Sequence, residues 1–194
     1  MGEASRRKRA NREWFSSLAG DERIVAETAL KLYHAFPDDG ACYRKAFFLR
    51  HYLRERHGIE AAAVVGFVND GTDELYGSHA WLDYQGKKVD LALSMPLRPE
   101  LQKRGPMLLL DWIYTPGWTG YTYHLDRPAT ALAEILELMR HPDTHELIQE
   151  AETLHLTMSA TARSDSLIEA YLANAPDGID FAKTAALVER TIID

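Results

Sequence analysis

The chain contains a single cysteine, Cys42, which follows the loop formed by residues 37–40 at the start of a predicted helix. Free amide hydrogens and the positive end of the helix dipole stabilise a thiolate at such a position. The same amides can stabilise the oxyanion that forms when a thiolate attacks a carbonyl carbon. Cys42 also continues the apolar face of its helix, so a buried structural cysteine is the alternative interpretation.

His79 and Asp90 are the two partners that a cysteine nucleophile needs. His79 lies in a predicted strand between small residues, where a rigid backbone can hold a general base near the thiol. Asp90 lies in the next predicted strand, and a two-residue turn at 85–86 places it opposite Trp81, on the face that also carries His79. A carboxylate beside an imidazole selects its tautomer and stabilises its protonated form. These residues therefore predict a Cys42, His79, Asp90 triad.

Three short segments carry the triad: GAC at 40–42, SHAWLD at 78–83 and QGKKVD at 85–90. Together they resemble the transglutaminase-like superfamily, which is similar in fold to papain and uses a Cys, His, Asp triad in this order. The short gap between the His and Asp strands also resembles the leader peptidases of lasso-peptide biosynthesis. The resemblance implies that Cys42 is the nucleophile, His79 the base and Asp90 the orienting acid.

The elements that must position these residues form an α+β pattern. Apolar periodicity predicts a helix over residues 21–35 and a second helix, carrying Cys42, over residues 41–56, capped by Asp38 or Asp39. Alternating apolar residues and turn signals predict the strands that follow. We expect a papain/transglutaminase-like core in which the nucleophile helix packs on an antiparallel sheet. The expected sheet strands are residues 61–68, 76–84, 87–93 and 107–114, with a short further strand at 121–125.

The chain divides into three regions of different charge. Residues 1–20 are predicted to be a basic, flexible arm that could contact an anionic partner. Residues 21–127 are the predicted catalytic core, and residues 128–194 an acidic extension made almost wholly of helices. The basic cluster consists of Arg6, Arg7, Lys8, Arg9 and Arg12. The helices expected in the extension are residues 131–139, 144–156, 164–173 and 180–193, with Pro176-Asp177-Gly178 as the last break.

Composition argues against several other classes of protein. A net charge of -7 disfavours a general nucleic-acid binder. No apolar run approaches the roughly 20 residues of a membrane span, and no apolar stretch follows the basic start of the chain as in a signal peptide. One cysteine forms no intrachain disulfide and suits a reducing compartment, so we expect a cytoplasmic protein. No glycine-rich phosphate loop is present, and no cofactor is expected.

Other residues of the chain offer weaker candidates for a functional site. His141 and His145 have a spacing that can bind a metal on one helix, but Pro142 places His141 before the helix, which argues against a metal site. Asp111 is a rival orienting acid, ranked below Asp90. A cluster of aromatic residues is predicted to serve packing, although it would also suit peptide or aryl substrates. The cluster comprises Trp112, Tyr114, Trp118, Tyr121 and Tyr123.

The sequence thus predicts a cysteine-dependent hydrolase or acyltransferase that acts on a peptide or protein carbonyl through a thioester intermediate. Water as acceptor gives a peptidase or amidase, and an amine gives a transglutaminase-type acyltransferase. The alternative is a non-catalytic binding module of the same fold, whose basic arm or acidic extension contacts a partner. For catalysis we expect the Cys42 sulfur to lie within about 4 Å of one ring nitrogen of His79, and Asp90 to form a hydrogen bond with the other ring nitrogen.

Overall fold

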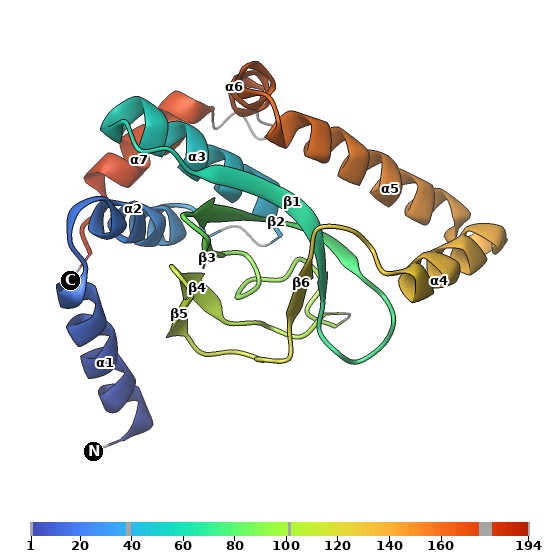
Figure 1. Ribbon diagram of the computed structural model, residues 1–194, viewed down its shortest axis with the longest axis horizontal. Coiled ribbons are helices and arrows are strands. Elements are labelled where there is room, and N and C mark those ends of the chain that lie inside the picture. The colour runs from blue at the N-terminus through green and yellow to red at the C-terminus, as the bar shows by residue number, and fades with distance from the viewer. Residues whose placement is uncertain (1, 38–39, 101, 175–179, 194) are drawn as a thin grey trace.

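The computed structural model describes residues 2–37, 40–100, 102–174 and 180–193, and within them the chain forms seven helices and six strands (Figure 1). Both element types occur along one chain, so the predicted α+β class is confirmed. The elements are α1 (Glu3–Ser17), α2 (Gly20–Ala35), α3 (Cys42–His57), β1 (Ala62–Asn69), β2 (Gly77–Tyr84), β3 (Lys87–Val89), β4 (Met107–Leu109), β5 (Trp112–Thr115), β6 (Thr122–His124), α4 (Ala129–Arg140), α5 (Pro142–Ala162), α6 (Asp165–Ala173) and α7 (Phe181–Arg190).

The main sheet is antiparallel and has the strand order β3-β2-β1-β6. The β2–β3 hairpin turns at Gln85 and Gly86, whose φ angles of 53° and 81° match the right-handed twist of the flanking strands. Leu82 pairs with Val89, so the predicted register of this hairpin is confirmed. That register brings residue 90 level with Trp81, at the end of β3.

The expectation of one long strand over residues 107–114 is wrong. The chain reverses at Leu110 and Asp111, whose φ angles are 52° and 64°, and β4 and β5 form a separate two-stranded hairpin. The strand expected over residues 87–93 is also shorter, because Asp90 leaves β2 and forms an isolated bridge with Leu108. Within residues 107–114 the only residue type that favours turns is Asp111, and the apolar residues around it predicted a continuous strand instead.

Helix α3 packs across β2 and β1 and supplies much of the hydrophobic core (Figure 1). Phe47 and Leu53 of α3 and Leu82 of β2 belong to this core and have no exposed surface. Gly58 ends α3 in a left-handed conformation with φ 65°, which a residue without a Cβ adopts at little cost. The N-cap of α3 is Ala41, and the expected caps Asp38 and Asp39 lie outside the described residues.

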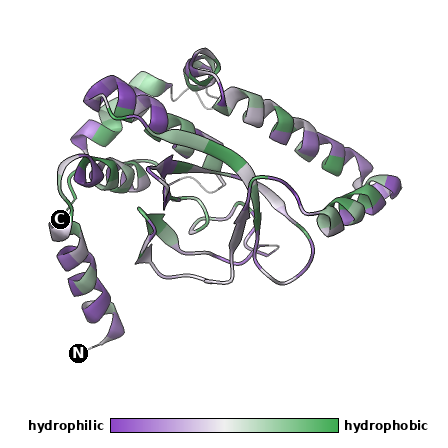
Figure 2. Cartoon of the chain, in the orientation of Figure 1, coloured by the Kyte–Doolittle hydropathy of each residue, from purple (hydrophilic) through white to green (hydrophobic). Residues whose placement is uncertain are grey.

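The region expected to be a flexible arm differs from that expectation, because residues 3–17 form the helix α1. Its buried Asn11 donates from Nδ2 to the carbonyl oxygen of Tyr114 at 2.8 Å and accepts from Trp112 Nε1 at 3.0 Å. Trp14 stacks on Trp112 with ring centroids 5.6 Å apart. These contacts with β5 give a largely hydrophilic helix (Figure 2) a defined position.

The predicted helices of the extension are confirmed as α4 to α7, and the break at residues 176–178 lies outside the described residues. Helix α5 packs along β1 and α4 packs on α5, while α6 contacts α3 and α7 contacts α2 (Figure 1). The extension therefore contacts the sheet through β1 and the helices α2 and α3. None of the described helices combines the length and the apolar character needed to cross a membrane.

Candidate active site

Cys42 is the first residue of α3, with 8% of its surface exposed. The first amides of a helix have no acceptor within the helix, so they point at groups placed beside Cys42. The preceding Gly40 has φ 65°, and its amide donates to the carbonyl oxygen of Met95 at 2.9 Å. A Cβ at position 40 would lie 2.5 Å from the Leu97 Cβ, so only glycine lets the two segments approach this closely.

His79 and Asp90 form a buried hydrogen-bonded pair, with His79 Nε2 2.7 Å from Asp90 Oδ2. The ring of Trp81 lies beside His79, with centroids 6.4 Å apart. Gly66 stands opposite His79 on β1, and a Cβ there would come within 2.9 Å of the Trp81 ring. The absence of a side chain at position 66 therefore leaves room for the indole that packs beside the imidazole.

Cys42 and His79 line the same pocket, and the interaction with Cys42 is among the causes that raise the pKa of His79. Because Nε2 of His79 faces Asp90, the ring nitrogen left for the thiol is Nδ1. The three residues singled out in the sequence are thus brought together, in the order thiol, imidazole, carboxylate.

Electrostatics favour a charged His79–Asp90 pair. Burial lowers the pKa of His79, but the Asp90 charge and its hydrogen bond outweigh burial, and the interaction with Cys42 adds to them, so the pKa lies above its ordinary value. Burial raises the pKa of Asp90, yet the charge of His79 and hydrogen bonds from His79, Tyr123 and Ala92 hold it below its ordinary value. With its raised pKa, His79 can act as a proton donor beside Cys42.

Besides His79, other hydrogen-bond donors contact both oxygens of the Asp90 carboxylate. Its Oδ2 accepts from the Tyr123 hydroxyl at 2.8 Å, and its Oδ1 accepts from the amides of Ala92 at 2.9 Å and Leu93 at 3.3 Å. From the sequence, Tyr123 was placed in an aromatic cluster for packing or substrate binding, and its contact with Asp90 was not predicted. Tyr123 lies on β6, which pairs with β1. Because Tyr123 and Asp90 are 33 residues apart in the chain, no local sequence pattern indicates that they are in contact.

A pocket of about 290 Å³ opens onto Cys42 and His79. Its walls are mainly apolar and include Leu93, Leu97 and Leu154, the last of these from α5. His79 is the only member of its described lining that can carry a positive charge, and no acidic side chain belongs to that lining. The pocket therefore favours an uncharged, apolar group next to the reacting carbonyl.

A second polar network joins the extension to the site. Ser78 Oγ lies 2.7 Å from the Tyr43 hydroxyl and 2.6 Å from Nδ1 of His155, a residue of α5. The His155 ring stacks on Phe67 with centroids 4.2 Å apart, and burial lowers its pKa although Glu152 acts in the opposite direction. Sequence reasoning missed this network, which holds α5 against the residue next to His79.

The weaker candidates lie elsewhere. Asp111 is exposed in the β4–β5 turn, where its Oδ1 is 3.7 Å from Lys88 Nζ. His141 is the N-cap of α5 and His145 lies within that helix, so the geometry argued from Pro142 is confirmed. Within the described part of the chain, no three metal-binding side chains gather at one place.

Comparison with protein-family models, with curated proteins and with solved structures found no match to this chain.

Proposed function

We propose that the protein is a cysteine-dependent hydrolase or acyltransferase, built on a papain/transglutaminase-like core, that acts on an amide or ester carbonyl of a peptide or protein. One observation carries the proposal. The only cysteine of the chain begins a helix and lines the same pocket as His79, whose Nε2 is 2.7 Å from the buried carboxylate of Asp90. A structural cysteine has no need of either partner, whereas a nucleophile needs both.

The reaction follows from these positions. The Cys42 thiolate attacks the carbonyl carbon, and the helix-start amides stabilise the oxyanion of the tetrahedral intermediate. Protonated His79 gives its Nδ1 proton to the leaving amine or alcohol as the C–N or C–O bond breaks, leaving a thioester on Cys42. Neutral His79 then takes a proton from water or from an acceptor amine, which attacks the thioester and releases the thiolate. Asp90 keeps the imidazole oriented throughout.

The apolar lining of the pocket supports a substrate with an uncharged, apolar residue beside the reacting carbonyl. Apart from His79, which pairs with Asp90, the described lining offers no acidic or basic side chain to compensate a charged residue for lost hydration. Peptides with leucine, phenylalanine or methionine at that position are therefore the first substrates to test, with water and with a primary amine as acceptors.

The test is labelling by an activity-based thiol probe, such as a peptide acyloxymethyl ketone with an apolar residue, read by intact mass. Wild type should be labelled once, and Cys42→Ser should not be labelled. His79→Ala should lose labelling, whereas His145→Ala, which removes an exposed histidine of α5, should be labelled at the wild-type rate. Equal labelling of wild type and His79→Ala would mean that the imidazole does not activate the thiol, and a binding module would be the better interpretation.

A further inference from the structure

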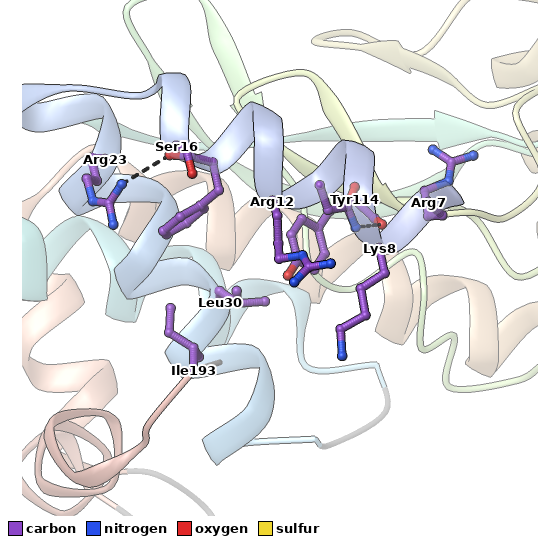
Figure 3. A pocket seen from close by; sticks show the side chains of 10 residues that line it. Arg7, Lys8, Arg12, Ser16, Arg23, Leu30, Tyr114 and Ile193 are labelled. Atoms are coloured by element: carbon purple, nitrogen blue, oxygen red, sulfur yellow. Dashed lines mark hydrogen bonds between the residues drawn. The ribbon is translucent and has the colours of Figure 1, made fainter. Parts of the chain in front are cut away.

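We infer that a second pocket, formed between α1 and α2, binds a small organic anion with an apolar body, namely a carboxylate or phosphate. The pocket has a volume of about 420 Å³ and is also lined by Tyr114 of β5 and by Ile193, which follows α7 (Figure 3). It shares no described lining residue with the pocket at Cys42. The inference therefore does not depend on the proposed catalytic function.

The charge of this pocket is positive in a chain whose net charge is -7. Four of its described lining residues are cations, from α1 and α2, and none is acidic. Arg7 donates to the carbonyl oxygen of Ile113 at 3.1 Å and Arg23 to that of Phe15 at 3.2 Å. These acceptors are neutral, and among the described residues neither guanidinium group forms an ion pair, although Arg23 also lies over the Phe15 ring. The four cations are Arg7, Lys8, Arg12 and Arg23.

Lys8 and Arg12 are the cations best placed to meet a ligand. They lie one helical turn apart, and Figure 3 shows both side chains extending from the same side of α1. Neither forms an ion pair with any described residue, whereas the neighbouring Arg9 pairs with Glu13 at 3.3 Å. Two like charges at this spacing destabilise a helix, and an anion between them would remove that repulsion and accept charge-assisted hydrogen bonds.

The rest of the pocket is apolar. Leu30 of α2 is 4% exposed and forms part of its wall, together with Phe15, Tyr114 and Ile193. This arrangement fits a ligand whose anionic head lies at Lys8 and Arg12 and whose aliphatic or aromatic body lies against these side chains. The volume is that of a small-molecule site. A nucleic acid would instead need cations spread along an open surface.

The pocket also has a fixed wall. Asn11, which belongs to its lining, is buried and hydrogen-bonded to both Tyr114 and Trp112, so α1 is anchored to β5 at this point. The cations of α1 are consequently held at one distance from Leu30 and Ile193, which is the preorganisation that a specific small-molecule site requires.

The experiment measures displacement of the fluorescent aryl sulfonate 1-anilinonaphthalene-8-sulfonate from the full chain. Octanoate and octyl phosphate should displace the dye, and the neutral octanamide should do so at least about tenfold more weakly, because it lacks the charge that Lys8 and Arg12 recognise. Lys8→Gln/Arg12→Gln should weaken octanoate binding by a similar factor. Arg6→Gln/Arg9→Gln removes the same charge from α1 outside the pocket and should bind like wild type.

Cys42→Ser should bind octanoate normally, so a failure of the catalytic proposal would leave this result unchanged. Circular dichroism checks that α1 remains helical in both double variants. Equal displacement by octanoate and octanamide, or equal weakening by both double variants, would overturn the inference. A dye displaced only by a DNA oligonucleotide would overturn it in favour of a nucleic-acid surface.

Discussion

Replacing Asp90 by asparagine is the sharpest test of the active-site geometry, because the two residues have the same shape and differ in one atom and one charge. The amides of Ala92 and Leu93 both donate to Oδ1, so the carbonyl oxygen of an asparagine must occupy that position. Its NH2 group then faces Nε2 of His79 and the Tyr123 hydroxyl. Nε2 has to become an acceptor, and the proton of the neutral imidazole moves to Nδ1, the nitrogen facing Cys42.

The expected magnitudes follow from these bonds. The hydrogen bonds that His79 and Tyr123 make with the charged carboxylate, about 1.5–3 kcal/mol each, become neutral hydrogen bonds of about 0.5–1.5 kcal/mol each. Asp90→Asn should therefore lower the free energy of unfolding by about 2–3 kcal/mol. A triad histidine held in the wrong tautomer loses about 10,000-fold in turnover, so thiol labelling by the peptide probe should fall by several orders of magnitude.

The stability difference should depend on pH in a defined direction. The raised pKa of His79 contributes stability that is complete below its unfolded value near 6.5 and is lost as pH rises through the folded value. The lowered pKa of Asp90 contributes stability that is complete above its unfolded value near 3.8 and is lost as pH falls through the folded value. Wild type and Asp90→Asn should thus differ most between about pH 4 and 6.5, and less on either side.

The assay is urea denaturation at several pH values, combined with the rate of labelling at Cys42. Asp111→Asn is the matched control, because Asp111 is an exposed acid at φ 64°, a conformation that asparagine tolerates well. This control should label and unfold like wild type. If Asp90→Asn also behaves like wild type in both measurements, the carboxylate does not act on the thiol through His79, and the reasoning fails.

Three further variants test other parts of the site. Tyr123→Phe removes one hydrogen-bond donor to the buried carboxylate, so it should lower the free energy of unfolding by about 1.5–3 kcal/mol in urea denaturation and reduce labelling less than Asp90→Asn does. An unchanged denaturation midpoint would show that this bond is not made. Gly40→Ala places a Cβ 2.5 Å from the Leu97 Cβ on a backbone with φ 65°. It should lower the free energy of unfolding by more than the roughly 1–2 kcal/mol that this backbone conformation alone costs, and it should slow labelling of Cys42. Wild-type stability and labelling would contradict the close approach of the two segments. Ser78→Ala removes the bridge to His155 and should increase hydrogen exchange in α5, measured by mass spectrometry, and equal protection would refute that anchoring role.

Much of the local structure could be predicted from the sequence. The apolar periodicity of residues 21–35 and 41–56 corresponds to α2 and α3, and the Gln85-Gly86 turn set the register of the β2–β3 hairpin. Such features depend on residues a few positions apart, whose side chains alternate or repeat on one face whatever the rest of the chain does. The start of α3 at Cys42 belongs to the same class, since Gly40 interrupts the backbone just before it.

The sequence alone misjudged the segments whose conformation depends on distant partners. Residues 107–114 have the composition of a single strand, yet Leu110 and Asp111 turn, and Asp90 and Leu108 then exchange two backbone hydrogen bonds of 2.9 Å each. The basic start of the chain has the composition of a flexible arm. It becomes α1 because Asn11 finds partners on β5, about 100 residues away.

By itself the sequence determined which three residues could form a triad and which elements carry them, because a helix start, a strand and a tight turn are local properties of the chain. Only the tertiary structure decided how these residues meet and what surrounds them: the Tyr123 hydroxyl on Asp90, His155 on Ser78, and the cations of α1 around a pocket. These contacts join strands and helices through the packing of the whole core. Contacts between residues far apart in the chain leave no periodicity in the sequence, which is why they were not predicted.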